Sequence, residues 1–353
     1  MNEDRELAVR DWLPRTAALL VGTLALATAF IAAYVGALHQ PTPRDVPVGV
    51  VLGDQRAQQV MAAVRARTDK IKPIEYDNPQ AADDGLTARG VYGVLASGPD
   101  NGLRLTIASA SAPAAAELVT QVLTQAARQA SLPLQVTDEV PVEGSDPRGL
   151  VPFYLAAGYV LGGYLASTAL GLKTGTAPVS LARAGLRIAA LAVYSIVLGV
   201  AGATVVGPIL DVWHHDVPAV AAVGALAVFA AAMVASAVQG WLGLLGTGIV
   251  ILLLVVLGNP GSGGIYAPEF LPDWLRGMHR WNVPGLATDL IKSAVYFDRR
   301  SMGWALTGLV VWALLGVLGL ITATMFRTHW RARRATRAAG ARTTAPDEPT
   351  TDG

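Results

Sequence analysis

Six apolar stretches, nearly free of charged residues, restrict this chain to the classes of membrane protein. They are residues 16–38, 150–172, 188–210, 217–238, 241–257 and 302–326. A helix needs about 20 apolar residues to cross the hydrocarbon core of a bilayer. Only 15% of all residues are charged, against about a quarter in soluble proteins. We therefore expect an α-helical integral membrane protein with six transmembrane helices.

One long polar segment, residues 39–148, separates the first two stretches. Strand-like runs at 46–52 and 71–76 alternate with a helical pattern at 55–68. Further strands are expected at 91–96, 103–108 and 134–142, and further helices at 78–89 and 113–130, the last capped by Ser111. We predict a small α/β domain of about 100 residues, which is large enough to have its own core. The chain has no cysteine, so this domain has no disulfide, and thiolate metal sites and cysteine nucleophiles are excluded.

The basic residues indicate which side of the membrane the ends of each span face. Lysine and arginine concentrate in cytoplasmic flanks, and with six spans the basic residues of 1–15, 173–187 and 327–353 fall on one side. The α/β domain then lies outside. The Ala, Arg, Gly and Val bias is typical of a GC-rich bacterium. We expect a multi-pass protein of the bacterial cytoplasmic (plasma) membrane, with both termini in the cytoplasm.

The segments at both termini allow more than one structural interpretation. Residues 1–15 predict either a short helix on the cytoplasmic membrane face or a frayed terminus. A cleaved signal peptide is the alternative for 16–38, but secretory apolar regions usually have about 7–15 residues, which favours an uncleaved span. The tail at 327–353 is basic and then polar; we expect it to contact anionic lipid and to be disordered towards its end.

The segment at 258–301 contains prolines, charges and aromatic residues between two apolar stretches. It predicts an outer interfacial element with short helices within 268–297, the second of them amphipathic over 284–297. Its marker residues are Pro268, Glu269, Pro272, Trp274, Trp281 and Pro284. A segment that dips into the membrane must have its backbone satisfied by surrounding protein, so we expect this element to pack among the spans.

The sequence contains few motifs for catalysis or for binding a cofactor or metal. The spans contain essentially no ionisable residue, which argues against an ion-coupled carrier. There is no phosphate-binding Gly-x-x-x-x-Gly-Lys-Ser/Thr loop and no Gly-x-Ser-x-Gly elbow, so we expect no enzyme and no cofactor bound by this chain. The adjacent His214 and His215, with Asp216, are a weak metal candidate; polar turn residues are the favoured interpretation.

Two further sets of residues each allow a functional interpretation and a purely structural one. Gly158 and Gly162 form a Gly-x-x-x-Gly pattern, which predicts close helix packing within the bundle or, less favoured, a dimer seam. Lys173, Arg183 and Arg187 are candidates for contact with a cytoplasmic partner. The favoured alternative is that these three residues only set the topology.

Three stretches carry a resemblance to a known family. They are Val-Pro-Val-Gly-Val-Val-Leu-Gly-Asp at 46–54, the strand at 91–96, and Ser-Gly-Gly-Ile-Tyr-Ala-Pro-Glu-Phe-Leu-Pro at 262–272 followed by Trp274, Trp281 and Pro284. With the layout of one span, an outside domain and five further spans, the chain resembles the ABC-2-type transporter membrane (permease) family, near the YhgE/Pip-like actinobacterial branch.

The resemblance implies the membrane subunit of an exporter that moves an amphiphilic substrate and uses ATP only through a separate ATPase subunit. It implies a homo- or heterodimer in contact with membrane lipids, and no nucleic-acid partner. By analogy, residues 1–15 would be an elbow helix and 173–187 the coupling element, although this loop is very short for that family. The alternative is a YhgE/Pip-like envelope or receptor protein whose outside domain binds a surface partner.

Overall fold

The computed structural model describes residues 3–213 and 216–343. Within them, five helices are long and apolar enough to cross a membrane. They lie in α1 (Glu3–Leu38), α5 (Val151–Thr174), α6 (Leu181–Thr204, continued by the π-helical η1, Val205–Ile209), α7 (Val217–Leu242) and α11 (Gly303–Thr343). A multi-pass helical membrane protein with a small sheet is therefore confirmed.

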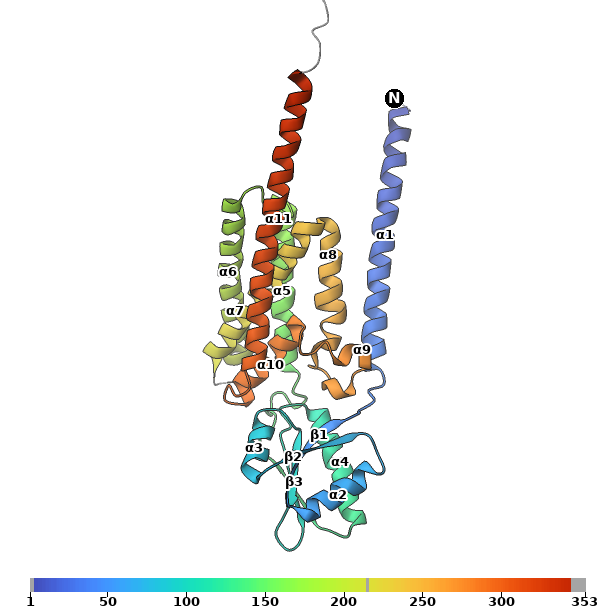
Figure 1. Cartoon of the computed structure of the whole chain (residues 1–353), viewed down its shortest axis with the longest axis vertical. Coiled ribbons are helices and arrows are strands. Elements are labelled where there is room, and N and C mark those ends of the chain that lie inside the picture. Colours follow the sequence, from blue (N-terminus) through green and yellow to red (C-terminus); the bar gives the residue numbers. More distant parts are fainter. Residues whose placement is uncertain (1–2, 214–215, 344–353) are drawn as a thin grey trace, which may run out of the picture.

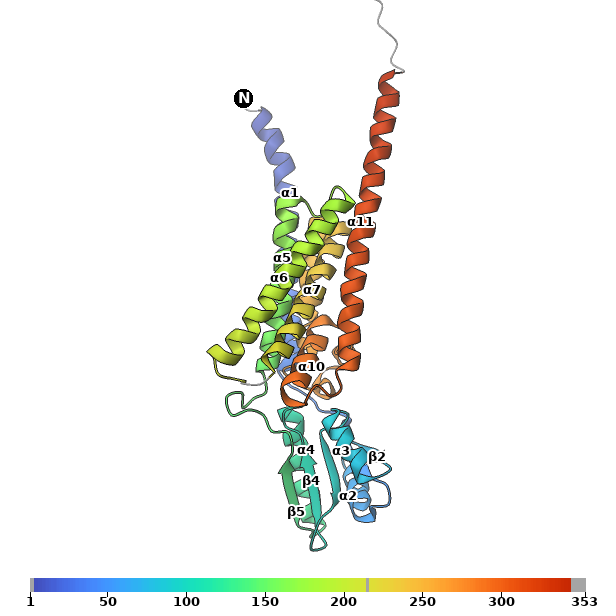
Figure 2. The same ribbon diagram turned by 90° about the vertical axis from the view of Figure 1, so that its left-hand side faces the viewer.

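Helix α7 is the centre of the bundle, with α5, α6 and α11 packed around it (Figures 1 and 2). Its alanines Ala227, Ala231 and Ala235 are completely buried. Small side chains let helix backbones approach closely, and within a membrane such packing replaces the hydrophobic effect as the main attraction between helices. The alanine-rich sequence of α7 thus explains why three other helices can pack against it.

The predicted fifth span differs from the structure. The sequence predicts spans at 217–238 and 241–257 with only Gln239 and Gly240 between them. In the structure α7 continues through these two residues to Leu242, and the chain turns at Gly243, whose φ is +64°. The helix that follows consists of α8 (Leu244–Ile251, 8 residues) and the π-helical η2 (Leu252–Leu257, 6 residues). This is shorter than the about 20 residues of a full span, so six full spans are not established.

The α/β domain contains one five-stranded sheet in the order β2-β1-β3-β4-β5, parallel except between β3 and β4. Its elements are β1 (Val46–Val51), α2 (Gln55–Arg65), β2 (Ile71–Tyr76), α3 (Pro79–Thr87), β3 (Gly93–Ser97), β4 (Leu103–Ile107), α4 (Pro113–Gln129) and β5 (Leu134–Asp138). Successive strand residues face opposite sides: Leu95 packs under α2 and α4, and Val94 packs under α3.

Every predicted strand and helix of this domain is present, with ends shifted by a few residues. Ser111 is not the cap of α4, because Ala112 occupies that position and no side chain caps the helix. The extended backbone of Ala112 and the proline in the first turn begin α4 instead.

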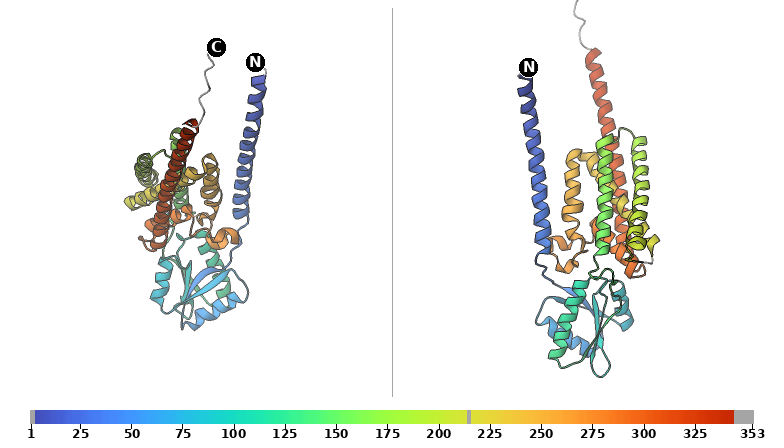
Figure 3. Two further views of the ribbon diagram at one scale, coloured as in Figure 1. Left: turned by 45° about the horizontal axis from the view of Figure 1, so that its top comes forward. Right: turned by 180° about the vertical axis from the view of Figure 1, so that it is seen from behind.

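The α/β domain lies at one end of the bundle, and the two ends of the described chain lie at the other (Figures 1 and 3). Residues of the 258–301 segment join the two parts. Phe270 packs into the core beneath α2 and α4, and Phe297 packs into the core beneath α3. The domain therefore docks on this segment with both faces of its sheet.

At the end of the bundle away from the α/β domain, three of the predicted segment boundaries are wrong. Residues 3–15 form no separate elbow helix, because they continue into the span as one helix, α1. The tail is helical as far as Thr343 and continues α11. Helix α6 begins at Leu181, so Arg183 and Arg187 are helical and the loop consists of residues 175–180. His214, His215 and the end of the tail, 344–353, lie outside the described residues.

The packing of α6 on α7 predicts the effect of one methyl group. A Cβ added at Gly199 would lie 2.5 Å from the carbonyl oxygen of Ala221 and the amide nitrogen of Ala225, both in the backbone of α7. We expect Gly199→Ala to lower the free energy of unfolding by about 1–3 kcal/mol, because the helices must separate. Unfolding in mixed detergent micelles, followed by circular dichroism, measures this.

Gly185→Ala is the matched control on the same helix, since nothing lies within 4 Å of the added atom. Alanine has the higher helix propensity, so this variant is expected to be neutral or slightly stabilised. Equal stability of the two variants would contradict the close packing of α6 on α7.

Candidate functional site

The segment between η2 and α11 forms short turns and one longer helix. These are η3 (Pro260–Ser262), η4 (Pro268–Phe270), α9 (Asp273–Arg276) and α10 (Val283–Tyr296). Helix α10 begins where the side chain of Asn282 accepts a hydrogen bond from the amide of Gly285, with Pro284 in the first turn. It packs among α5, α7 and α11 and is buried along most of its length. The prediction that this element packs among the spans is confirmed.

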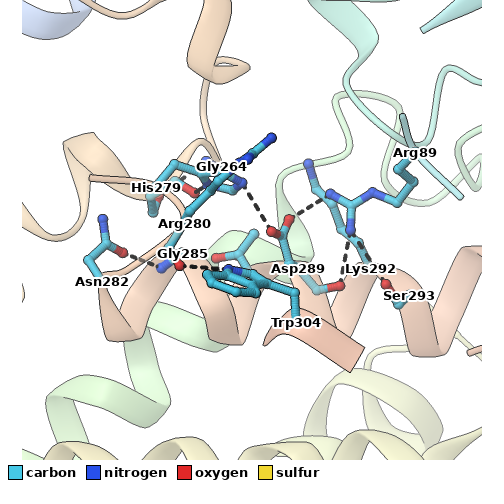
Figure 4. Close-up of polar contacts among 12 residues, drawn as sticks. Arg89, Gly264, His279, Arg280, Asn282, Gly285, Asp289, Lys292, Ser293 and Trp304 are labelled. Atoms are coloured by element: carbon cyan, nitrogen blue, oxygen red, sulfur yellow. Dashed lines mark hydrogen bonds and ion pairs between the residues drawn. The ribbon is translucent and has the colours of Figure 1, made fainter. Parts of the chain in front are cut away.

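The polar residues of α10 face the α/β domain. Asp289 and Lys292 are three positions apart, so they lie on one side of the helix. The Asp289 carboxylate accepts from Arg89 Nη2 at 2.6 Å and lies 3.0 Å from His279 Nε2 (Figure 4). Arg89 Nη1 also donates to the backbone carbonyl of Asp289. Arg89 directly follows α3, so this ion network ties the domain to α10.

Lys292 makes the second connection. Its side chain is 3% exposed, and its Nζ donates to the backbone carbonyl of Ser111 at 2.9 Å. Ser111 precedes α4, whereas Arg89 follows α3, so α10 contacts the domain at two separate points. A buried ammonium held by one carbonyl, without a direct carboxylate partner, is an expensive arrangement.

Glu269 makes a third connection, outside α10. Its Oε2 accepts from the hydroxyl of Tyr92 in the domain at 2.9 Å. Its backbone carbonyl accepts from the amide of Arg44 at 3.0 Å and from Arg276 Nη2 at 3.1 Å. Arg276 Nη1 also lies 4.0 Å from Asp45 Oδ2. Glu269 therefore binds the linker, the domain and α9 together.

A cavity of about 890 Å³ lies between the α/β domain and the bundle. The domain lines it with residues that include Asp45, Lys72, Arg89, Tyr92 and Ser111, and the membrane part with Glu269, Arg276, His279, Arg280, Asp289, Lys292 and Trp304. Every charged side chain that the three connections use is in this lining; Arg44, which contributes only its backbone amide, is not. The connections and the cavity thus form one polar site at the domain–bundle junction.

The charge state of His279 follows from its two neighbours. Its Nδ1 lies 2.6 Å from the carbonyl oxygen of Ser262, and its Nε2 faces Asp289. An imidazole with an acceptor at each nitrogen needs a proton on each to satisfy both. Burial lowers the pKa of His279, but Asp289 and the Ser262 carbonyl outweigh burial and raise the pKa above its ordinary value.

The other two titratable groups of the network shift in the direction that their neighbours require. Burial works to raise the pKa of Asp289, yet the charges of His279 and Arg89 hold that pKa well below its usual range. Burial, reinforced by the charge of Arg89, lowers the pKa of Lys292 to about 8. Asp289 is therefore an anion at neutral pH, and Lys292 loses its proton far more easily than a lysine in water.

The predicted outer element is divided between this site and the membrane boundary. Pro268 and Glu269 line the cavity. Pro272 precedes α9, and Trp274 is exposed. Trp281 is exposed and packs edge-on against Trp304, with ring centroids 5.0 Å apart.

The other predicted residues lie far from the cavity. Lys173 and Arg183 are exposed, whereas Arg187 is buried and donates to the carbonyls of Gly175 and Thr176. Arg187 therefore stabilises the 175–180 loop from inside.

The two glycines of the Gly-x-x-x-Gly pattern differ in their surroundings. A Cβ at Gly162 would lie 2.3 Å from Leu198 of α6, and one at Gly158 would meet nothing within 4 Å. The structure thus uses Gly162 for packing within the bundle.

Sequence reasoning missed Arg89 and His279. The amphipathic pattern predicted over 284–297 includes Asp289 and Lys292 but assigns neither of them a role. The available signal was a pair of opposite charges three positions apart on a helix that is otherwise apolar. No group of three or more potential metal ligands occurs among the described residues. The His214–His215 candidate lies outside them.

Comparison of the chain with protein-family models, with curated proteins and with solved structures gave no match. The resemblance to the ABC-2-type family therefore stays a prediction. The function has to be inferred from the geometry of the chain itself.

Removal of the Asp289 charge is expected to loosen the domain. Asp289→Asn leaves Arg89 and His279 without their counter-ion; breaking a fully buried pair in this way costs about 3–5 kcal/mol, and we expect a smaller loss here because these side chains are 15–22% exposed. We expect a lower melting temperature and faster proteolysis of the linker at 139–150, measured on the full chain in detergent. Asp298→Asn is the control, because Asp298 is exposed just beyond α10. Equal effects of the two changes would show that the network does not hold the domain.

The network also predicts a dependence on pH. A histidine with a raised folded-state pKa stabilises fully below its unfolded value, about 6.5, and this stabilisation is lost as pH rises through the folded-state pKa. We expect wild type to exceed His279→Gln in melting temperature by most at about pH 6, and by progressively less as the pH rises through the raised pKa of His279. The difference between the two proteins cancels the opposite contribution of Lys292, which removes a cost as pH rises above about 8. A difference that grows with pH would contradict a protonated His279.

Proposed function

We propose that this chain is the membrane subunit of an ABC-2-type exporter that moves an amphiphilic substrate outward with a separate ATPase subunit. The observation that carries the proposal is the incomplete crossing formed by α8 and η2, followed by the buried helix α10. Short and irregular segments occur at membrane depth where they are buried in protein or line a pathway. A simple anchor for an outside domain needs only complete spans.

The energy source is inferred from the composition of the spans. The described residues 16–38, 151–172, 188–204, 217–242 and 303–326 contain no Asp, Glu, Lys, Arg or His. The charged residues of α10, Asp289 and Lys292, both contact the α/β domain, so they lie at the outer end of the bundle. Transporters driven by ions or protons place such groups within the membrane. The proposal therefore assigns the driving force to ATP hydrolysis in a partner, which would bind at the end opposite the α/β domain.

The 175–180 loop is the proposed contact for that partner. Exposed Lys173 and Arg183 flank the loop. Arg187 donates to the carbonyls of Gly175 and Thr176 and to the hydroxyl of Thr174. A short loop fixed in this way would pass a push from the partner directly into α5 and α6.

A dimer is proposed from the position of α1. This helix contacts the rest of the chain mainly through η2 and η3, and its apolar side chains, such as Leu20, Leu24 and Ile31, are exposed. Lipid covers part of this surface in any membrane protein; in the proposed exporter a second subunit covers the remainder. The proposal places the chain in a bacterial plasma membrane with both termini in the cytoplasm.

The alternative, an envelope or receptor protein without transport, is favoured by one observation. A groove of about 660 Å³ lies between α2 and α4 on the α/β domain and is lined by residues that include Arg56, Arg67 and Lys70. Its position on the domain suits a surface partner. The two functions differ in whether an ATPase binds the other end of the molecule.

Affinity purification from the membranes of the native host, followed by mass spectrometry, tests the exporter. We expect an ATP-binding-cassette protein to copurify with wild type, and Arg183→Glu to reduce its recovery at least about tenfold, which corresponds to about 1.4 kcal/mol. The matched control is Arg104→Glu, an exposed arginine of the α/β domain. Absence of any such ATPase would favour the receptor function instead.

A further inference from the structure

Two buried donors without an acceptor belong to residues of the domain–bundle cavity. Among the described side chains, the Nε atoms of Arg89 and Arg276 are buried and have no hydrogen-bond partner. Both residues line the cavity. Buried polar groups in proteins are almost always satisfied, and an unsatisfied one calls for an explanation such as a missing ligand. The guanidinium groups of Arg89 and Arg276 therefore have unused donor capacity beside the cavity.

The cavity also has an excess of positive charge. Its lining contains Lys72, Arg89, Arg276, Arg280 and Lys292 against Asp45, Glu269 and Asp289, and the protonated His279 adds to the positive side. The Asp289 carboxylate already pairs with Arg89 and His279, and the Glu269 carboxylate accepts from the hydroxyl of Tyr92. The lining thus has more cations than carboxylates, and two of its three carboxylates already have close partners.

Lys292 shows the shortage most clearly. Its ammonium donates to the carbonyl of Ser111 and has no carboxylate of the described residues in contact. Asp146 also acts on Lys292 electrostatically, but the Asp146 carboxylate accepts from the amides of Leu150 and Val151 at the start of α5. An anion in the cavity would stabilise the charged form of Lys292, which burial now disfavours.

The edge of the cavity leads to an apolar surface. Trp304 and Ala305, at the start of α11, are part of the lining. Leu306 and Val310 follow on α11 with exposed side chains. Exposed indoles such as Trp304 are typical of the membrane–water boundary. A molecule with an anionic head in the cavity could therefore keep its apolar part against α11.

We propose that the cavity binds the phosphate headgroup of an anionic amphiphile. Arg276 and Lys292 hold the phosphate, Arg89 is shared between it and Asp289, and the apolar part lies along the start of α11. Guanidinium groups suit this role, because their N–H donors match phosphate oxygens in geometry. The identification of this amphiphile as the transported substrate rests on the proposed function, whereas the binding itself does not.

Binding of phosphatidylglycerol to the delipidated full chain in phosphatidylcholine nanodiscs tests the proposal, with native mass spectrometry as the readout. We expect phosphatidylglycerol to bind in preference to phosphatidylcholine. Arg276→Gln and Lys292→Met should each weaken binding at least about tenfold, because each removes a charge-assisted contact with the phosphate. Lys292→Arg keeps the positive charge and should retain binding. Arg299→Gln is the control, because Arg299 pairs with Asp216 and is not part of the lining.

Three results would overturn the proposal. The first is unchanged binding of phosphatidylglycerol by Arg276→Gln and Lys292→Met. Both variants must be folded, which is shown by the same elution volume as wild type. The second is equal binding of phosphatidylcholine and phosphatidylglycerol. The third is inorganic phosphate that competes fully at equal concentration, which would make the site one for free phosphate. The assay needs no ATPase, so its failure is distinct from the failure of the exporter proposal.

Discussion

The carboxylate of Asp289 is the interaction on which the arrangement of the two parts depends. It joins Arg89 of the α/β domain and His279 of the loop before α10. The chain itself connects the two parts only through irregular linkers, between Leu38 and Val46 and between Asp138 and Val151. Removing one partner from an ion pair shielded from water costs more than the complete pair contributes, and these side chains are only 15–22% exposed. The network therefore fixes where the domain sits, although it need not add much to stability.

Local sequence pattern predicts most of the elements, because strands and amphipathic helices repeat within a few residues. The strand Ile71–Tyr76 is predicted with its observed ends. The pattern fails at Gln239, which resembles a turn because it is polar between apolar runs. In the structure this side chain is buried in α7, and its Nε2 donates to Thr168 Oγ1 at 2.8 Å. A hydropathy pattern does not contain such partners, so it places the break between the two helices at Gln239 and not at Gly243.

The candidate site is harder to predict, for a different physical reason. Arg89 and Asp289 are 200 positions apart, and a single sequence carries no information on which distant charges meet. Asp289 and Lys292 are detectable as polar positions of an amphipathic helix, but that pattern predicts contact with water. The α/β domain replaces the water here, because Arg89 and the carbonyl of Ser111 satisfy the same polar groups. Amphipathicity shows that a face is polar and does not reveal its partner.

Helix α5 gives the two ends of the molecule a physical connection. It begins where Asp146, whose charge acts on Lys292 of the cavity, accepts from the amides of Leu150 and Val151, and it ends at the loop held by Arg187. Between these points Gly163 packs directly against the backbone of α7. Close-packed interfaces of this kind move as units and do not deform continuously. A push on the 175–180 loop would therefore reach the cavity only if α5 has two discrete positions against α7, and the small residues along their interface are where such a shift would have to occur.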